Sequence, residues 1–426
     1  MTPVRRMAIV VGGGPAPGIN SVIGAATIRA RLEGVEVLGV RDGFERLMTG
    51  DGSAAAPLTI DDVSRIHFRG GSVLGISRAN PTRDPADLDR VVATLAALKV
   101  DGLVTIGGDD TAFSAMQVAR AAGSGLRVVH VPKTIDNDLD LPAYIDTFGF
   151  RTARHVGAEL VKNLMVDAFT TSRWYFVVAM GRKAGHLALG IGKSAGATLT
   201  LIPEEWRDGE ATLATLVDTL AAAIVKRESE GSRHGVAVIA EGVALSVRPE
   251  DLASFGEVER DAHGHVRIAE IDIGDLLKRA VRERLAKLGM RKTIVAKDIG
   301  YELRCADPIP SDMEYTRDLG YCAAKFLLEG GTAAMVSMQG DRFVPIPFDE
   351  MLDPETGRTK VRLVDIASTR YAIARRYMIR VRRDDFADAD ALARLAATCG
   401  LDVDAFRAQF EHVTRREPPA LHLLPK

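Results

Sequence analysis

The sequence has few cysteines and no long apolar stretch, the features that mark disulfide-bonded and membrane-spanning proteins. Its 426 residues include three cysteines, Cys305, Cys322 and Cys399, at no metal-ligand spacing. So few cysteines exclude a disulfide scaffold and favour a reducing compartment. No uncharged apolar stretch reaches the roughly 18 residues of a membrane-spanning helix, and the N-terminal segment lacks the apolar core of a signal peptide. We therefore expect a cytoplasmic protein without a membrane partner.

The sequence also lacks an excess of charge. Its 55 Lys and Arg residues against 57 Asp and Glu residues give a formal net charge of −2, which argues against a strongly basic nucleic-acid-binding protein. We interpret the arginine-rich stretch 370–383 as a solvated or inter-subunit helix face. With 46% hydrophobic and 26% charged residues the composition is that of a globular protein, and the length predicts two or three domains.

Short apolar runs recur along the chain, each bounded by glycine, proline or a charged residue. Runs that are apolar along their whole length are typical of strands buried on both faces of a parallel sheet. We predict seven such strands, at 7–11, 35–40, 103–106, 127–131, 174–180, 198–202 and 236–240. Helical periods separate them, as in residues 88–98 and 213–224, so βαβ units are expected.

Two segments share the same order of strand, Gly-rich turn and helix. Strand 7–11 leads through GGGPAPG into a helix from Asn20, and strand 174–180 leads through GRKAG into a helix from His186. This repetition predicts an α/β fold of two doubly wound, Rossmann-like lobes with mainly parallel sheets. Ligands of such sheets bind beyond the carboxyl ends of the strands. We therefore expect the active site in the cleft between the lobes.

The motif GGDDT at 107–111 directly follows a predicted strand and opens a helical pattern. Its glycines let a ligand approach the backbone, and a helix N-terminus favours phosphate. The adjacent carboxylates of Asp109 and Asp110 would repel phosphate unless a cation lay between them, and Mg²⁺ prefers such oxygen ligands. The alternative is that both aspartates only cap the helix.

Two further clusters follow predicted strands. In PKTIDND, at 132–138, one carboxylate could act as a general base with Lys133 as a phosphate clamp, and the alternative is an Asx-rich turn. The loop GGGPAPGIN, at 12–20, reads GxGxxxG instead of GxGxxG and contains two prolines. We therefore do not expect a nicotinamide site there.

In order, spacing and strand context these motifs resemble those of the phosphofructokinase family. GGGPAPGIN and GGSVLGISR (70–78) are similar to its Gly-rich loops, and GGDDT and PKTIDND to its catalytic loops. MGR (180–182), AEG (240–242) and GYELR (300–304) resemble its sugar-phosphate contacts. The resemblance covers residues 7 to about 340. It implies the phosphofructokinase fold and phosphoryl transfer to the 1-hydroxyl of fructose 6-phosphate.

The resemblance also implies a role for each matched position. Asp136 is expected to be the general base, Arg78 to stabilise the transferred phosphoryl group, and Asp109 to hold Mg²⁺. The residues expected to be catalytic are Thr134, Asp136, Asp138, Arg78 and Arg182. Those expected to bind the phosphoryl donor and set its specificity are Gly13, Asp110, Thr111 and Lys133. Those expected to bind the sugar phosphate are Thr134, Ile135, Asp136, Arg173, Met180, Gly181, Arg182, Glu241, Tyr301, Glu302, Leu303 and Arg304.

The family also implies a partner. In its members one of the two arginines that clamp the 6-phosphate, here Arg173 and Arg304, comes from a neighbouring subunit. A homodimer or homotetramer with a subunit-shared active site is therefore expected. We expect no nucleic acid among the partners.

Two positions bear on the phosphoryl donor. ATP-using members resemble GGDGS and PGTIDND, whereas Asp110 and Lys133 stand here where those motifs have glycine. A carboxylate at 110 would crowd and repel the α-phosphate of ATP, and an ammonium at 133 would pair with the terminal charge of pyrophosphate. This indicates the pyrophosphate type and a reversible reaction. The alternatives are an ATP-dependent 6-phosphofructokinase, sedoheptulose 7-phosphate as the sugar, and an inactive regulatory or scaffold subunit.

The resemblance suggests domain limits. Residues 1–148 with about 302–353 would form the phosphoryl-donor lobe. Residues 149–301 with about 354–384 would form the sugar-phosphate lobe, and 385–426 a C-terminal helical extension. This extension goes beyond the shorter bacterial members and would shape an interface or cover the cleft.

Two positions depart from the family pattern. Val295 stands where some members have a sugar-phosphate arginine, and Lys297 could substitute for it. Arg151 stands where aspartate is more frequent. The sequence alone offers no account of Arg151.

Overall fold

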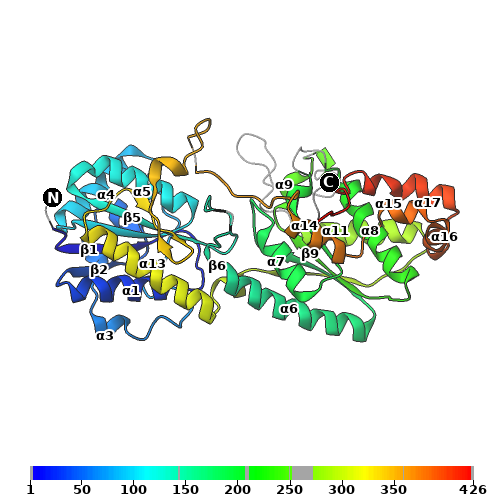
Figure 1. Cartoon of the computed structure of the whole chain (residues 1–426), viewed down its shortest axis with the longest axis horizontal. Coiled ribbons are helices and arrows are strands. Elements are labelled where there is room, and N and C mark those ends of the chain that lie inside the picture. Colours follow the sequence, from blue (N-terminus) through cyan, green and yellow to red (C-terminus); the bar gives the residue numbers. More distant parts are fainter. Residues whose placement is uncertain are drawn as a thin grey trace. The chain divides into compact units, whose positions relative to one another are not determined.

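The structure is a computed structural model that describes residues 3–142, 144–206, 211–248, 250–251, 272–357 and 359–423. The chain divides into two compact units (Figure 1). Unit 1 is Met1–Ala153 with Tyr301–Arg362, and unit 2 is Arg154–Gly300 with Leu363–Lys426. The unit limits fall at 153, 300 and 362, beside the expected lobe limits at 148, 301 and about 353.

Unit 1 is built on a mainly parallel sheet of strand order β14-β11-β5-β4-β1-β2-β3, with β6 paired to β5 off this path. The strands are β1 (Arg6–Val11), β2 (Glu36–Val40), β3 (Ala55–Pro57), β4 (Gly102–Gly107), β5 (Arg127–Thr134), β6 (Phe148–Gly149), β11 (Ala334–Met335) and β14 (Ile346–Pro347). Only β3 and β14, the two edge strands, pair antiparallel in this sheet. A separate hairpin joins β12 (Met338–Gln339) and β13 (Arg342–Phe343).

Helices cover both faces of this sheet, which makes three layers (Figure 1). Alternate residues of β1 divide between two hydrophobic cores, as the twofold period of a strand requires. Met7, Ile9 and Val11 pack with helices α1 and α13, whereas Ala8 and Val10 pack with α4 and α5. The helices of unit 1 are α1 (Ile19–Leu32), α2 (Glu45–Met48), α3 (Ile60–Val63), α4 (Pro85–Ala97), α5 (Asp109–Ala122), α12 (Tyr301–Arg304) and α13 (Pro310–Leu328).

Unit 2 contains a smaller sheet whose four strands are all parallel, in the order β10-β7-β9-β8. These strands are β7 (Trp174–Ala179), β8 (Leu199–Leu201), β9 (Gly235–Ala240) and β10 (Ile294–Ile299). The main helices are α6 (Phe150–Thr171), which begins in unit 1, α7 (His186–Ala195), α8 (Leu213–Ser229), α9 (Val243–Ser246), α11 (Ile273–Lys287) and α14 (Thr369–Tyr377). In the part of the chain that the structure describes, no helix is both long and apolar enough to cross a membrane.

The predicted α/β fold with mainly parallel sheets is confirmed, and the seven predicted strands overlap β1, β2, β4, β5, β7, β8 and β9 with ends that differ by a few residues. The helices expected from Asn20 and His186 are α1 and α7. The sequence did not reveal β10, because Lys297 and Asp298 interrupt its apolar character where the strand runs along the sheet edge. The other strands that were missed have two or three residues each.

The interpretation of the arginines at 370–383 as a solvated or inter-subunit face is wrong for two of them. Arg375 and Arg380 are buried and share the buried carboxylate of Glu205. The distance from Nη1 to Oε2 is 2.9 Å for Arg375 and 2.8 Å for Arg380. These ion pairs attach the segment around α14 to the turn after β8 within unit 2.

The described residues beyond 385 are largely helical and belong to unit 2. The elements are α15 (Arg383–Ala387), α16 (Ala389–Thr398) and α17 (Val403–Phe410). Lys226 of α8 forms an ion pair with Asp385 at 2.7 Å, and Nε2 of His412 lies 3.3 Å from Oδ2 of Asp218 of the same helix. Because α16 also packs on α8, this segment is part of the fold of unit 2.

Candidate active site

Three loops of unit 1 start at the carboxyl ends of β1, β4 and β5, which are neighbours in the sheet. The amide of Gly12 donates to the carbonyl of Ile106 at 2.9 Å, so the first two loops are joined through their backbones. The buried side chain of Thr111 fills the space between them. A Cβ atom at Gly12 or Gly107 would lie 2.5 or 2.4 Å from Oγ1 of Thr111. Glycine is therefore required at both positions for this close packing.

Lys133 is the charged centre of this edge. It is only 4% exposed, and its ammonium donates to the carbonyl oxygen of Gly14. A Cβ atom at Gly13, where φ is +86°, would lie 3.2 Å from Nζ of Lys133, and one at Gly14 would lie 3.3 Å from Cζ of Arg304. The Gly-rich loop, Lys133 and Arg304 therefore converge, and the Gly-rich loop passes both cations because it has no side chains there.

Burial lowers the pKa of Lys133 from the ordinary value of 10.5 to about 8. The positive charge of Arg304 lowers it as well, whereas the carboxylates of Asp136, Asp138 and Asp109 act in the opposite direction. The structure thus brings five of the predicted site residues into one electrostatic neighbourhood. A buried cation surrounded by carboxylates is expected where a site binds an anionic substrate and also uses carboxylates in the reaction.

Asp109 and Asp110 begin helix α5. The amide of Asp110 donates to Oδ1 of Asp109 at 2.9 Å within the first turn, while the N-cap position is Gly108 and has no side-chain cap hydrogen bond. Asp110 is exposed, and Asp109 is partly exposed. Within the described ranges, no group of three or more His, Cys, Asp or Glu side chains is gathered to hold a metal ion.

The TIDND residues follow β5 in a hydrogen-bonded turn. Oγ1 of Thr134 accepts from the amide of Asp136 at 3.0 Å and donates to Oδ1 of Asp138 at 3.0 Å. Asn137 takes the left-handed conformation with φ of +57°. Ile135 is buried, whereas Asp136 is only partly buried. The turn predicted as the alternative is present, and it holds both carboxylates near Lys133.

His130, in the middle of β5, is a residue of this region that sequence reasoning missed. It is fully buried, with Nδ1 2.9 Å from Oγ1 of Thr105 and Nε2 3.0 Å from the carbonyl oxygen of Gly107. Burial lowers its pKa to about 3, so the ring is neutral and Nε2 donates to Gly107. His130 therefore fixes the end of β4 from which the GGDDT loop starts. Its only signal was a polar residue within the apolar run RVVHV.

In unit 2, the predicted sugar loops meet at the carboxyl ends of β7 and β9. The amide of Glu241 donates to the carbonyl of Ala179 at 2.9 Å, and that of Gly242 to Gly181 at 3.2 Å. A Cβ atom at Gly242 would lie 2.5 Å from the carbonyl oxygen of Arg182. Met180, Gly181, Arg182 and Glu241 are thus brought together, with the Arg182 side chain exposed.

Residues Tyr301–Arg304 of the GYELR motif form helix α12 of unit 1, and Gly300 is the last residue of the preceding stretch of unit 2. Leu303 is buried, Glu302 is exposed and Tyr301 is 79% exposed. The guanidinium of Arg304 lies over the Tyr301 ring, 5.7 Å from its centroid. Because Arg304 also lies against Gly14, it is placed beside the Gly-rich loop of the same unit.

Arg78 is exposed, just after Ser77, whose carbonyl accepts from the amide of Gly13 at 2.9 Å. The second Gly-rich loop is thereby fixed beside the first. A parallel bridge between Gly12 and Ser77 adds to this contact. Arg78 is thus placed beside the Gly-rich loop.

Arg173 does not join the sugar loops of its own unit. It precedes β7, whereas Met180–Arg182 follow β7, and at about 3.3 Å per residue the two ends are more than about 20 Å apart. Arg173 lies 3.8 Å from the carboxylate of Asp167 instead. Lys297, the suggested substitute at Val295, is exposed in the middle of the edge strand β10.

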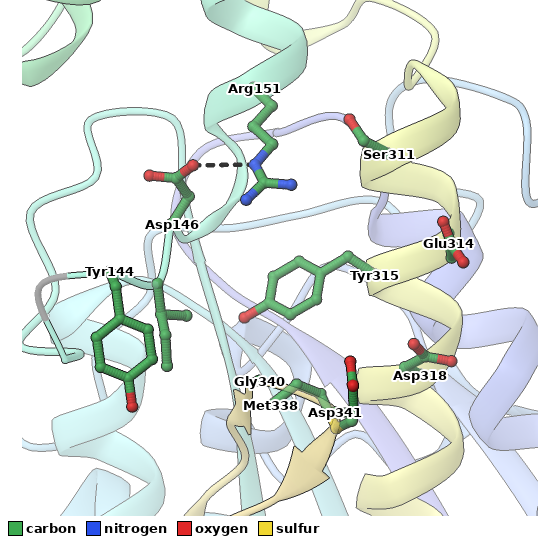
Figure 2. Close-up of a pocket in the computed structure, with 11 residues that line it drawn as sticks. Tyr144, Asp146, Arg151, Ser311, Glu314, Tyr315, Asp318, Met338, Gly340 and Asp341 are labelled. Atoms are coloured by element: carbon green, nitrogen blue, oxygen red, sulfur yellow. Dashed lines mark hydrogen bonds and ion pairs between the residues drawn. The ribbon is translucent and has the colours of Figure 1, made fainter.

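The structure explains Arg151. Its Nε lies 2.9 Å from Oδ2 of Asp146, and an aspartate at 151 would face Asp146 with like charge. Figure 2 shows this pair on one side of a pocket of about 510 Å³, with Tyr315 reaching toward it from α13. The arginine thus neutralises a carboxylate on the loop that follows the TIDND residues.

Comparisons with known proteins identify the family that the chain resembles. The family model described as phosphofructokinase matches residues 6–327. A Thermotoga maritima protein named pyrophosphate--fructose 6-phosphate 1-phosphotransferase is 52% identical over 96% of this chain and 99% of its own length. One of the same name from Naegleria fowleri is 50% identical over 97% of this chain and 96% of its own length.

Solved structures show the same fold. A pyrophosphate-dependent phosphofructokinase from Nitrosospira multiformis superposes with a TM-score of 0.65 at 18% identity, over 93% of this chain and 92% of its own. With the matches above, the chain belongs to the phosphofructokinase family.

Lys133 leads to a prediction about stability and pH. Between about pH 8 and 10 the unfolded chain keeps a proton on Lys133 that the folded chain has lost, so folding stability rises with pH. At neutral pH the buried charge costs free energy, and Lys133→Met should be more stable than the wild type. We expect this advantage to shrink by about 3 kcal/mol toward pH 10 in urea unfolding curves. An advantage that does not change with pH would contradict the depressed pKa.

Proposed function

We propose that this protein transfers a phosphoryl group reversibly from pyrophosphate to the 1-hydroxyl of fructose 6-phosphate, giving fructose 1,6-bisphosphate and phosphate. The observation that carries the proposal is the buried ammonium of Lys133 against the Gly-rich loop, with Asp110 at the start of α5. Where these two residues stand, ATP-using members have glycine. The names of the two relatives that are about half identical over nearly their full length support the same activity.

The donor is proposed to bind at the edge formed by β1, β4 and β5. Lys133 and the amides of the Gly-rich loop would hold pyrophosphate, and the start of α5 would add its partial positive charge. Asp110, which is exposed, would repel a further phosphate group and so disfavour ATP. Arg78 would stabilise the charge on the phosphoryl group in transfer.

Mg²⁺ is proposed as the cofactor, held by Asp109. The carboxylate is a hard oxygen ligand, and the ion usually takes one or two carboxylates together with substrate phosphates, which suits a region without a larger acidic cluster among its described residues. When bound, it would neutralise charge on the pyrophosphate oxygens.

The acceptor is proposed to be activated by Asp136. Its carboxylate would take the proton of the 1-hydroxyl as that oxygen bonds to the terminal phosphorus, and the bond to the leaving phosphate would break. Thr134 and Asp138 would keep the loop in shape through their mutual hydrogen bond. Arg182, Met180, Gly181 and Glu241 would bind the sugar, with the residues of α12 at its phosphate.

A second copy of the chain is also proposed. Arg173 and Arg182 lie at opposite ends of β7 and cannot reach one small sugar phosphate from the same subunit. If both bind substrate, Arg173 must act in the site of a neighbouring copy. This supports a homodimer or homotetramer with a shared site.

The role of Asp136 has a direct test. We expect Asp136→Asn to lower kcat for fructose 1,6-bisphosphate formation by about 10²–10⁴-fold with a modest change in KM, because a general base is removed. The matched control is Asp140→Asn, an exposed carboxylate of the same loop, which should leave kcat unchanged. Near-normal turnover of Asp136→Asn in a coupled assay would remove Asp136 as the base.

The donor has its own test. Pyrophosphate and ATP are supplied in separate assays with Mg²⁺ and fructose 6-phosphate, and turnover is expected with pyrophosphate alone. In the double variant Asp110→Gly with Lys133→Gly, pyrophosphate use should weaken because both charges are lost. Wild-type turnover with ATP alone, or pyrophosphate kinetics unchanged in the variant, would refute the donor assignment. Inactivity with both donors would favour sedoheptulose 7-phosphate, and then the scaffold alternative.

The shared site can be tested by mixing subunits. Arg173→Ala and Arg182→Ala should each be weakly active alone. When they are refolded together in equal amounts, mixed dimers contain one site with both arginines, so about a quarter of wild-type activity should return. No recovery in mixtures shown to contain hybrid dimers would mean that the two arginines do not belong to one shared site.

A further inference from the structure

The loop that carries Asp136 lies outside helices and strands. Residues 135–147 lead from the end of β5 to β6. Backbone carbonyls in such a segment have no strand or helix partners and need others when they are shielded from water. Four of those described here, the carbonyls of Asn137, Leu141, Pro142 and Ile145, accept from a single side chain, that of Arg362, the last residue of unit 1.

The guanidinium of Arg362 is surrounded by oxygen atoms of this loop. Its Nε donates to the carbonyl of Asn137 at 3.1 Å. Its Nη1 donates to the carbonyls of Leu141 and Pro142, both at 3.2 Å, and of Ile145 at 2.7 Å. Its Nη2 donates to the side-chain oxygen of Asn137. Both ends of the loop and its middle are thus tied to one group.

The attachment extends to the residues next to Asp136. The amide of Arg362 donates to the carbonyl of Asp138 at 2.8 Å, and Val361 forms an antiparallel bridge with Leu139. Asn137 holds the left-handed conformation, which asparagine adopts more readily than other non-glycine residues. The backbone on the carboxyl side of Asp136 is therefore set by Arg362.

The amino side of Asp136 is held by different groups. The hydroxyl of Thr147 donates to the carbonyl of Thr134 at 2.7 Å on this side, and the amide of Thr147 donates at 2.9 Å to Oδ1 of Asn137 on the carboxyl side, the oxygen that also accepts from Arg362. These bonds close the loop, and the carbonyls of Leu141, Pro142 and Ile145 accept from Arg362, with the amide of Ile145 also donating to Pro142. Only a guanidinium offers five donors in a fixed plane, so lysine cannot replace this pattern.

We propose that Arg362 is a positioning residue that aims the Asp136 carboxylate by fixing the backbone of Asn137 and Asp138. The proposal rests on the proposed function in that it takes Asp136 as the base. Arg362 lies beyond residues 6–327, which the family model matches, and its contacts to the loop cross more than 200 positions of sequence.

The test uses Arg362→Lys in the full-length protein. We expect kcat to fall by about 10²-fold, the cost of misplacing a reacting group by about 1 Å, with little change in KM for either substrate. In the Asp136→Asn background the same change should lower kcat less than about threefold, because the positioned group is already lost. An equal loss in both backgrounds, or a folded Arg362→Lys with wild-type kcat, overturns the proposal.

A measurement that does not depend on activity distinguishes the positioning role of Arg362 from the proposed function. Hydrogen exchange of peptides within 135–147 should become at least about tenfold faster in Arg362→Lys. The matched control is Arg382→Lys in unit 2, whose Nη2 donates to three carbonyls, of Arg375, Arg376 and Met378, at 2.9, 3.1 and 3.0 Å. That variant should change neither kcat nor exchange in this loop.

The outcomes separate as follows. Unchanged exchange in Arg362→Lys overturns the positioning role, whatever the reaction is. A wild-type protein inactive on fructose 6-phosphate, with faster exchange in the variant, refutes the proposed function and leaves the loop attachment standing. If Arg362→Lys fails to fold while Arg382→Lys folds, Arg362 serves folding and the positioning role is rejected.

Discussion

The buried ammonium of Lys133 is the interaction on which the donor edge of unit 1 depends. A desolvated cation loses hydration that only nearby carbonyls and carboxylates can replace. The carbonyl of Gly14 and the field of Asp109, Asp136 and Asp138 replace part of it, and the pKa still falls to about 8. The loop beside it must come so close that a Cβ atom at position 13 would lie 3.2 Å from Nζ. Glycines and carboxylates in three separate motifs are thus linked through one charge.

Much of this edge could be predicted from the sequence because its causes are local. Strands buried on both faces read as unbroken apolar runs, and the carboxyl ends of adjacent parallel strands meet at one edge. The positions of GGGPAPG, GGDDT and PKTIDND after three such runs placed each motif at the carboxyl end of a strand, and the resemblance assigned all three to one site. The short pairing of β6 with the end of β5 left no comparable signal, since two residues carry no period.

The residues that were missed or misread depend on partners far away in the chain. Arg375 and Arg380 look like surface charges until Glu205, some 170 positions earlier, is found between them. His130 is one polar residue in an apolar strand, and its function follows only from the register that sets it beside Thr105 and Gly107. Arg362 was missed for the same reason, because the loop that it binds lies more than 200 positions earlier in the chain. Local periodicity and motif spacing contain no information on pairs of this sort, because tertiary packing alone brings them together.

The two ends of β7 hold candidate ligand residues far apart. Arg173 at its start and Met180–Arg182 after its end are resemblance-based candidates for one ligand, but an extended chain holds them more than about 20 Å apart. A β-strand cannot shorten without losing the ladder that pairs β7 with β9 and β10, so no rearrangement within the sheet brings them together. If both assignments hold, each copy gives one end of this strand to its own site and the other end to a neighbour's. Assembly would then be a condition for binding the sugar phosphate, which would make activity depend on protein concentration.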